Sequence, residues 1–352
     1  MDQQRLEAFM GQFVQDLGAA ATAPLVVLGD RLGLYKAMAD GSPVTPAELA
    51  ERTGCRERYV REWLCQQAAS GYIEYEDGAF RLPPEHAVAL ADDESPNFIP
   101  GAFQLLSAMV KDEPRIRERF RSGEGMPWGD HDHDLFEGTE RFFRPGYLAN
   151  LNDAWLPALD GVVEKLSAGA RVADIGCGHG ASTILMAQAF PESSFVGSDI
   201  HPASIEAARD AAARAGVDVT FEVASAADFG GGPFDLVCVF DALHDMGDPV
   251  GVAAHVRSQL AEDGTWMVVE PYAGDRVEDN LNPVGRVFYA GSTLLCTPNS
   301  LSQDVGLALG AQAGERRLAE VLHEGGFEHV RRAAETPFNL VLEVRPATAV
   351  MH

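Results

Sequence analysis

The spacing of apolar residues divides the chain into a mostly helical first part and a second part in which strands and helices alternate. Up to about residue 165 the apolar positions recur at helical spacing, as in the segment from Leu25 to Tyr35. From Arg171 onward, short apolar runs separated by helical stretches predict a parallel sheet with helices on both faces. The strands are predicted at residues 171–175, 195–199, 219–224, 235–240 and 265–270.

Residues 1–100 carry the signals of three helices followed by a hairpin. The segment Thr45-Pro46-Ala47-Glu48 supplies a cap residue, a proline at the first helical position and an acid in the first turn. A further helix is predicted over residues 57–70, and two short runs on either side of Asp77-Gly78 predict a hairpin. This order of elements predicts a winged-helix domain, and its long apolar first helix favours a role in homodimerisation.

Residues 101–165 are predicted to be helical on both sides of an irregular segment at residues 123–134, and to form a linker and a substrate lid. Near the end of the chain, the runs 327–333 and 338–344 predict a hairpin that adds two strands to the sheet. The expected fold class is therefore α/β, with a Rossmann-like, seven-stranded, mostly parallel sheet and an N-terminal α-helical winged-helix domain. The predicted domains are residues 1–100, 101–165 and 166–346.

The charge balance argues against nucleic acid as a partner. The chain of 352 residues carries 53 acidic and 27 basic side chains and a net charge of -26. Residues 1–100 hold eight basic and sixteen acidic side chains, the opposite of the clustered lysines and arginines that phosphate contacts require. Docking on an anionic membrane is not expected either.

The cysteines and the apolar runs predict a cytoplasmic protein. The five cysteines are dispersed, and no Cys-x-x-Cys pair occurs, which is typical of reduced thiols without disulfides or a structural zinc site. No apolar stretch reaches the roughly 18 residues of a membrane span. The first five residues open no signal peptide.

A glycine-rich turn at the end of the first predicted strand indicates a nucleoside cofactor. Asp174 is followed by glycines at every second position, Gly176, Gly178 and Gly180, where backbone can approach a ligand closely. The next strand ends at Asp199, and an acid roughly 20 residues past such glycines suits the hydroxyls of a ribose. The spacing Gly-x-Gly-x-x-Ala also satisfies the dinucleotide fingerprint, which leaves nicotinamide cofactors open. Asp174 and Gly180 fit better with S-adenosylmethionine, whose ammonium needs acceptors and which has no pyrophosphate.

Ligands of such sheets bind beyond the carboxyl ends of the strands, near the point where the strand order reverses. Small residues after the third strand would let an adenine lie against backbone amides. The residues expected to bind the cofactor are Asp174, Gly176, Gly178, Gly180, Asp199, Ile200, Ser225, Ala226, Phe240 and Asp241.

His244 is predicted to be the general base of the site. It lies just past the fourth strand, whose end is marked by Asp248 as a helix cap and Pro249 at the first helical position. Glu270 ends the adjacent strand, where its carboxylate could orient the imidazole ring. A lone histidine is more often structural, but this placement predicts a general base. It would remove the proton of a hydroxyl that accepts the methyl group of S-adenosylmethionine, with Asp245 and Glu270 as its catalytic neighbours. No metal is required for this chemistry.

These motifs resemble those of a known family. Asp174-x-Gly176-x-Gly178-x-Gly180 resembles the first motif of class I S-adenosylmethionine-dependent methyltransferases. His244-Asp245-x-x-Asp248 resembles the His-Asp segment of small-molecule O-methyltransferases of the plant caffeate and bacterial polyketide type. The resemblance implies that His244 deprotonates the acceptor hydroxyl, that Glu270 flanks this base, and that the winged-helix domain forms a homodimer.

The resemblance covers most of the chain and is closest to winged-helix methyltransferases of the actinobacterial and mycobacterial type. Ser225 or Ala226 stands where O-methyltransferases of this type have an aspartate, so the adenine contacts are expected to fall to backbone. Residues 271–314 are longer and differently built, so the acceptor cannot be carried over from the family.

The acceptor side is predicted from two irregular segments. In residues 123–134, His131 and His133 alternate with carboxylates, a pattern open to a solvated loop, a substrate lid or a metal site. Glycine and proline neighbours argue for a loop, and no metal is expected. The segment 271–314 is expected to line or cover the acceptor. The residues expected to contact the substrate are Trp128, His131, His133, Arg286, Tyr289 and Gln303.

The predicted function is S-adenosylmethionine-dependent methyl transfer to a small-molecule acceptor. The first alternative is a non-catalytic regulator that senses S-adenosylmethionine or binds DNA through the winged helix. The second is a nicotinamide-dependent oxidoreductase. Binding of S-adenosylhomocysteine separates the oxidoreductase from the other two, and salt-dependent binding to duplex DNA would favour the regulator.

Overall fold

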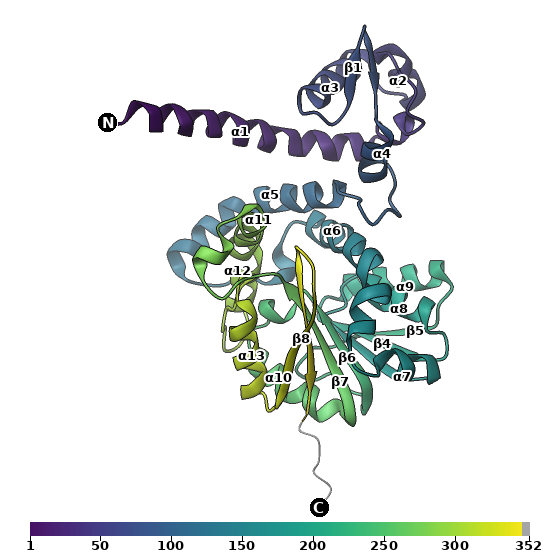
Figure 1. The fold of residues 1–352 in the computed structure, drawn as a ribbon, viewed down its shortest axis with the longest axis vertical. Helices are drawn as coiled ribbons and strands as arrows, with labels where there is room; N and C mark the ends of the chain where they lie inside the picture. Colours follow the sequence, from purple (N-terminus) through teal and green to yellow (C-terminus); the bar gives the residue numbers. More distant parts are fainter. Residues whose placement is uncertain (347–352) are drawn as a thin grey trace, which may run out of the picture. The chain divides into compact units, whose positions relative to one another are not determined.

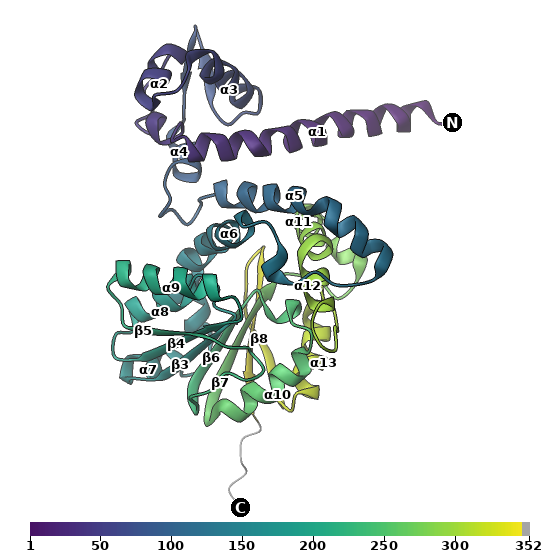
Figure 2. The same ribbon diagram turned by 180° about the vertical axis from the view of Figure 1, so that it is seen from behind.

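The computed structural model describes residues 1–346 and divides the chain into two compact units (Figures 1 and 2). The first unit consists of Met1–Ala108 and Glu137–Gly146, and the second of Met109–Phe136 and the chain from Tyr147 onward. Two helices, α5 (Pro100–Ser122) and α6 (Asp134–Asn150), contribute to both units. The domain boundaries at residues 100 and 165 stay predictions.

The first unit contains the predicted winged helix. The threonine hydroxyl of Thr45 accepts a hydrogen bond from Glu48 N and the Glu48 carboxylate accepts one from Thr45 N, so the capping box predicted at this position is present. A core around Tyr35, Leu49 and Trp63 holds the elements together. In chain order they are α1 (Gln3–Arg31), η1 (Lys36–Met38), α2 (Pro46–Thr53), α3 (Glu57–Ala69), β1 (Glu74–Glu76), β2 (Ala79–Arg81) and α4 (Pro84–Leu90).

The second unit is built on a seven-stranded sheet with the strand order β5-β4-β3-β6-β7-β9-β8. Strands β3 to β7 are parallel neighbours, and β9 pairs antiparallel with both β7 and β8. The predicted α/β fold class is confirmed. The strands are β3 (Arg171–Ile175), β4 (Ser194–Asp199), β5 (Val219–Val223), β6 (Phe234–Phe240), β7 (Leu260–Pro271), β8 (His329–Glu335) and β9 (Asn339–Arg345).

Strand β7 begins at Leu260, before the predicted start at residue 265. Leu260 pairs with Phe234 across an irregularity in the register, while regular pairing with β6 begins at Thr265. The acidic residues between these two positions interrupt the apolar run, so the sequence pattern predicted the regular part of the strand alone.

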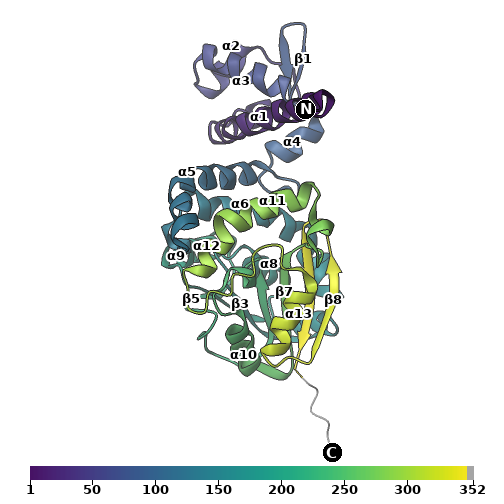
Figure 3. The same ribbon diagram turned by 90° about the vertical axis from the view of Figure 1, so that its left-hand side faces the viewer.

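Helices cover both faces of the sheet (Figures 1 and 3). Helices α8 (Ala181–Ala189) and α9 (Pro202–Ala215) contact β4 and β5, whereas α10 (Pro249–Gln259) contacts β7 and α13 (Gly314–Glu324) contacts β8. Trp266, Phe234 and Phe327 are fully buried in the core that α10 and α13 share with the sheet. The shorter helices of this unit are η2 (Trp128–Asp130), η3 (Leu151–Trp155), η4 (Leu156–Ala158), α7 (Val162–Ala168), η5 (Leu243–Asp245), η6 (Val277–Asn280), α11 (Pro283–Gly291), η7 (Ser292–Cys296) and α12 (Thr297–Leu301).

The strand order reverses between β3 and β6. From β3 the chain continues outward to β4 and β5 on one side, and it returns to β6 on the other side of β3. Because β3, β4, β6 and β7 are parallel, the residues that follow them meet at one edge of the sheet, where ligands of such folds bind. Within residues 1–346, every helix is too short or too polar to cross a lipid bilayer.

Candidate active site

The glycine turn after β3 has a left-handed backbone at three positions. Gly176, Gly178 and Gly180 have φ values of 69°, 53° and 78°. A β-carbon on Gly180 would lie 2.6 Å from Phe221 Cζ, whereas one on Gly178 would meet nothing within 4 Å. Packing therefore requires Gly180, and Gly178 leaves its side of the turn open to a ligand.

Asp174, near the end of β3, is buried, and only one of its two carboxylate oxygens has hydrogen-bond partners. Its Oδ2 accepts hydrogen bonds from Ser182 Oγ at 2.7 Å and Thr183 Oγ1 at 2.6 Å, both at the start of α8. Its Oδ1 is buried and has no hydrogen-bond partner among the described residues. Burial raises the pKa of Asp174 to about 6. A buried acceptor without a partner suits a cationic group of a ligand.

The raised pKa of Asp174 predicts a pH dependence of stability. The ordinary pKa of 3.8 applies to the unfolded chain, so the folded chain holds this proton more tightly. The free energy of unfolding therefore falls as the pH rises from about 4 to about 6, by about 3 kcal/mol for this group. We expect Asp174→Asn to lack this loss, so that its stability relative to the wild type increases between pH 4 and pH 7 in urea denaturation.

Asp210→Asn, at an exposed position of α9, is the matched control because it removes a carboxylate from the surface. Its stability relative to the wild type should change little over the same interval. A constant difference between Asp174→Asn and the wild type at all pH values would contradict the raised pKa.

Asp199 connects the end of β4 to the glycine turn. Its Oδ2 accepts a hydrogen bond from Gly178 N at 3.0 Å and its Oδ1 accepts one from His201 N at 2.8 Å. Burial raises the pKa of Asp199, and the two amide hydrogen bonds oppose that shift. The structure thus brings together the acid and the glycine turn that the sequence pattern assigned to one cofactor.

The remaining predicted cofactor residues lie around this edge of the sheet. Ile200 follows Asp199 and is 54% exposed. Ser225 and Ala226 follow β5, and the Ser225 hydroxyl accepts a hydrogen bond from Ala227 N at 3.1 Å. Phe240 ends β6, with its ring centroid 5.2 Å from that of Tyr147.

Asp241 follows Phe240 in a strained backbone conformation, with a φ of 50°. Its carboxylate is buried and accepts a hydrogen bond from Asn339 Nδ2 at 3.0 Å. Burial and the nearby Glu270 carboxylate raise the pKa of Asp241. Strained residues of this kind cluster at functional sites.

His244 is buried and is held by Glu270. The ring Nδ1 lies 2.6 Å from Glu270 Oε2, and Glu270 Oε1 accepts a hydrogen bond from Leu243 N at 2.9 Å. The glutamate therefore fixes both the ring and the backbone of η5. Since β6 and β7 are parallel neighbours, their carboxyl ends bring the two residues together, as the sequence analysis expected.

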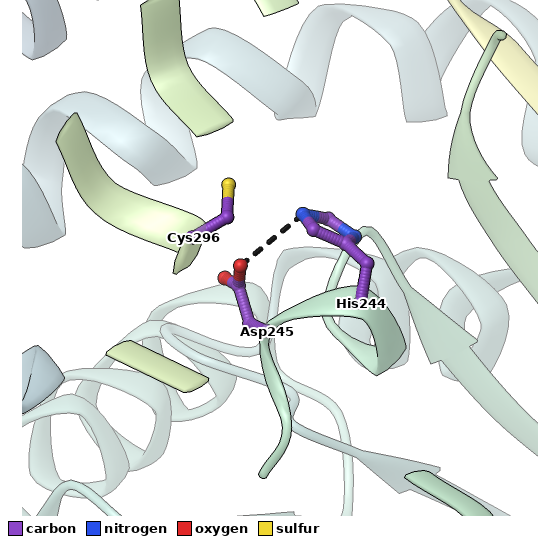
Figure 4. A group of neighbouring side chains, drawn as sticks. All are labelled: His244, Asp245 and Cys296. Carbon is purple, nitrogen blue, oxygen red and sulfur yellow. Dashed lines mark ion pairs between the residues drawn. The ribbon is translucent and has the colours of Figure 1, made fainter. Parts of the chain in front are cut away.

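The other ring nitrogen of His244 faces Asp245 and the thiol of Cys296 (Figure 4). Nε2 lies 3.2 Å from Asp245 Oδ1. Burial lowers the pKa of His244, but the carboxylates of Glu270 and Asp245 outweigh burial and hold the pKa well above its usual value. Burial raises the pKa of the Cys296 thiol to about 12.

The two histidines of the loop at residues 123–134 lie in different environments. His131 is buried, with Nδ1 2.7 Å from Asp112 Oδ2, whereas the side chain of His133 is 87% exposed. Burial lowers the pKa of His131, so the ring is neutral and its Nε2 is a hydrogen-bond acceptor. This Nε2 is buried and has no hydrogen-bond partner within residues 1–346.

A set of hydrogen bonds joins this loop to the backbone around His244. Trp128 N donates to Asn299 Oδ1 at 3.0 Å, and Asn299 Nδ2 donates to the carbonyl of Asp245 at 3.3 Å. Gln303 Nε2 donates to the same carbonyl at 3.0 Å, and Gln303 Oε1 accepts from Gly247 N at 3.0 Å. The predicted substrate residues Trp128 and Gln303 are therefore placed beside the predicted base.

Arg286 and Tyr289 lie on α11, where Arg286 is exposed and Tyr289 is half-buried. Their role in binding the substrate stays a prediction. Asp112 and Asn299 were not predicted from the sequence. Asp112 lies in the middle of α5 and Asn299 in α12, and a single polar residue within a helix carries no sequence signal of what it contacts.

Two segments of the chain match known families. Residues 166–325 match the family described as "Methyltransferase domain", and residues 20–92 match the "Rv2258c-like winged HTH domain". Among curated proteins, none matches the chain.

Solved structures share the fold over nearly the whole chain. The mitomycin 7-O-methyltransferase MmcR is 21% identical, with 98% of this chain and 100% of that chain covered and a TM-score of 0.70. An O-methyltransferase family protein from Burkholderia thailandensis is 20% identical, with 98% of each chain covered and a TM-score of 0.67. Human N-acetylserotonin methyltransferase, solved in complex with S-adenosylmethionine, is 15% identical, with 99% of each chain covered and a TM-score of 0.69.

Proposed function

We propose that this S-adenosylmethionine-dependent methyltransferase, which carries its methyltransferase domain behind an Rv2258c-like winged-helix domain, methylates a hydroxyl group of a small molecule with His244 as the general base. The observation that carries the proposal is the Glu270–His244 pair. A buried imidazole with one nitrogen 2.6 Å from a carboxylate is oriented to exchange a proton at its other nitrogen, which lies on the side of Asp245 and Cys296.

The cofactor site fits S-adenosylmethionine. The open side of Gly178 admits a ligand against backbone, Asp199 offers a carboxylate for ribose hydroxyls, and the unpaired Asp174 Oδ1 suits an ammonium. We assign Ile200, Phe240 and the backbone at Ser225 and Ala226 to the nucleoside, and Asp241 to the polar end of the cofactor. S-adenosylmethionine, when bound, supplies an electrophilic methyl group on a positively charged sulfur.

His244 then removes the hydroxyl proton of the acceptor. The proton passes to Nε2 while Glu270 holds Nδ1 and stabilises the imidazolium that forms. Asp245 Oδ1 lies beside Nε2, so an acceptor hydroxyl has to displace this oxygen to reach the base. Asp245 is therefore part of the site where the proton is transferred. Against the effect of burial, Glu270 and Asp245 hold the pKa of His244 above its usual value. The ring therefore first loses its Nε2 proton to solvent, and it is then a stronger proton acceptor than a free imidazole.

We place the acceptor against the loop at residues 123–134 and the segment after β7. Trp128 offers an aromatic face, and the unpaired Nε2 of His131 accepts a hydrogen bond from a donor on the acceptor molecule. His133 lies at the exposed side of this loop, and Gln303 supports η5 from the segment after β7. Arg286 and Tyr289 complete the proposed set. The acceptor itself is a small molecule.

A binding titration and an acceptor screen test the function. Purified protein should bind S-adenosylhomocysteine in calorimetry, and it should release this product from S-adenosylmethionine when the correct phenol or other hydroxyl compound is present. Failure to bind S-adenosylhomocysteine would favour the oxidoreductase. Binding together with a screen in which only amines or thiols are methylated would contradict the hydroxyl acceptor.

No observation favours the regulator. The arginines of α3 that would face DNA are already paired on the helix itself, Arg58 with Glu62 and Arg61 with Glu57. These pairs leave little free positive charge for phosphate contacts. We also propose that the enzyme works in the cytoplasm, since all five of its cysteines are free thiols, which fits a reducing compartment.

The first half of α1 supports the proposed homodimer. Between Gln3 and Arg31 the helix buries only positions from Thr22 onward, so its first five turns lie outside the core. Six large apolar side chains are exposed there and recur at helical spacing. They are Leu6, Phe9, Met10, Phe13, Val14 and Leu17. A second copy of the same helix is the partner we propose, because the stripe is self-complementary in an antiparallel or parallel helix pair.

We expect the double variant Phe13→Glu/Leu17→Glu to convert a dimer into a monomer in analytical ultracentrifugation. Four buried carboxylates per dimer would have to be desolvated inside an apolar seam. Gln15→Glu, on the opposite side of α1, adds a charge outside the stripe and should leave the dimer intact. A monomeric wild type, or a double variant that stays dimeric, would contradict the role of this helix.

A further inference from the structure

Three atoms of different chemical type converge beside the proposed base. His244 Nε2, a carboxylate oxygen of Asp245 and Cys296 Sγ all lie within 4.8 Å of one another (Figure 4). The first two side chains come from η5 and the third from η7. Imidazole nitrogen, carboxylate oxygen and thiolate sulfur are the three ligand types that zinc takes in proteins.

The distances are close to those of a zinc site. Bonds of about 2.0 Å to nitrogen or oxygen and about 2.3 Å to sulfur place the tetrahedral ligands of such a set about 3.3–3.5 Å apart. The separation of His244 Nε2 and Asp245 Oδ1 is 3.2 Å, and the thiol needs to approach by no more than about 1.3 Å to complete the set.

The surroundings of these atoms also favour a cation. His244 Nδ1 is bound by Glu270, the carboxylate–histidine arrangement that orients metal-binding imidazoles. Asp245 Oδ1 is buried, and its contact with Nε2 is a charge contact without a hydrogen bond. Asp241 adds another buried carboxyl group nearby. The acids of this cluster outnumber its one imidazole.

We infer that His244, Asp245 and Cys296 form a binding site for Zn²⁺ that switches off the proposed base. As the N–Zn and S–Zn bonds form, the imidazolium of His244 and the thiol of Cys296 each release a proton to solvent. The ion then occupies the Nε2 lone pair that would accept the proton of the acceptor hydroxyl. Zinc therefore inhibits by competing with the acceptor and not with the cofactor. The inhibition, though not the binding, rests on the proposed function.

A second cluster of possible ligands does not share these properties. Asp132, His133 and Asp134 also lie close together, but the His133 side chain is 87% exposed. The Nζ of Lys111 already lies 2.9 Å from Asp132 and 2.6 Å from Asp134. Lys111 thus already supplies the positive charge that this second cluster needs.

Zinc binding is measured on the full-length protein, without cofactor or acceptor, by competition with a chromophoric zinc chelator. We expect one tight site per chain in the wild type and an affinity at least about 100-fold lower in Cys296→Ser, since even the loss of an outer-sphere partner costs 10- to 100-fold. Cys65→Ser is the matched control because it removes an exposed thiol, and its affinity should equal that of the wild type.

Cobalt provides a second measurement that needs no variant. Co²⁺ bound in place of zinc should give the intense near-ultraviolet absorption of a cobalt–thiolate bond, which zinc then displaces. No such absorption in the wild type, or equal zinc affinity in the wild type and Cys296→Ser, overturns the site even if Cys296→Ser folds poorly.

The failure of this inference is distinguishable from the failure of the proposed function. Once an acceptor is known, zinc should raise its apparent KM in the wild type and leave the KM for S-adenosylmethionine unchanged. Cys296-dependent zinc binding in a protein that methylates no hydroxyl keeps the site and rejects the function. Methyl transfer to a hydroxyl that zinc does not inhibit, in a protein without Cys296-dependent zinc binding, keeps the proposed function and rejects the zinc site.

Discussion

Substitution of His244 by alanine is expected to lower kcat for methyl transfer to a hydroxyl by about 10²–10⁴-fold, the usual contribution of a general base. The hydroxyl would have to lose its proton to water while the methyl group is transferred. The dissociation constant for S-adenosylhomocysteine should change less than about threefold, because the proposed cofactor contacts lie in the glycine turn and at Asp199. Single-turnover assays with labelled S-adenosylmethionine separate the two quantities.

The stability of His244→Ala must be measured alongside its activity. Removal of the ring leaves Glu270 buried without one of its two partners, which costs about 1–3 kcal/mol. His329→Ala, at the exposed first residue of β8, is the control and should match the wild type in both rate and stability. Full activity in a folded His244→Ala would remove this residue from the mechanism and point to an amine or thiol that arrives already reactive.

Asp199→Ala should weaken cofactor binding and leave kcat nearly unchanged, the opposite of what we expect for His244→Ala. Two charge-assisted hydrogen bonds to ribose hydroxyls contribute about 1.5–3 kcal/mol each, and part of that is recovered by solvation, so the affinity for S-adenosylhomocysteine should fall about 10²-fold. The same substitution removes the acceptor for Gly178 N and His201 N, which loosens the glycine turn. At saturating cofactor, kcat should remain within a few-fold of the wild type.

Isothermal titration of Asp199→Ala, Asp199→Asn and the surface control Glu206→Ala measures this effect. Asn keeps one acceptor oxygen without the charge and should fall between alanine and the wild type. Glu206 lies on α9 in an exposed ion pair with Arg209 and should have no effect. An unchanged affinity in Asp199→Ala would show that the ribose is bound elsewhere.

The sequence predicted the parts of this site that depend on regular structure. Asp174, Asp199 and His244 each lie where an apolar run gives way to turn residues, so their place at the ends of strands followed from the local pattern. The pairing of His244 with Glu270 required one more step, the assumption that the fourth and fifth strands are neighbours. Parallel pairing of β6 and β7 satisfies it.

The parts that could not be predicted depend on long-range packing. His131 binds Asp112 across 19 positions of chain, which include the end of α5 from Asp112 to Ser122 and the irregular loop that follows. Cys296 reaches His244 through η7, which lies in a segment between β7 and α13 that no strand fixes. Neither loop geometry nor the side of a helix that meets a loop can be obtained from apolar periodicity.

Asn299 binds the loop through Trp128 N and holds the carbonyl of Asp245, next in the chain to His244. The loop that we propose to contact the acceptor is therefore joined by hydrogen bonds to the backbone that positions the imidazole. Replacing the loop with that of a relative would change the orientation of the His244 ring as well as the proposed contacts with the acceptor. Substitutions in this loop that are made to change the acceptor should therefore alter kcat as well as KM.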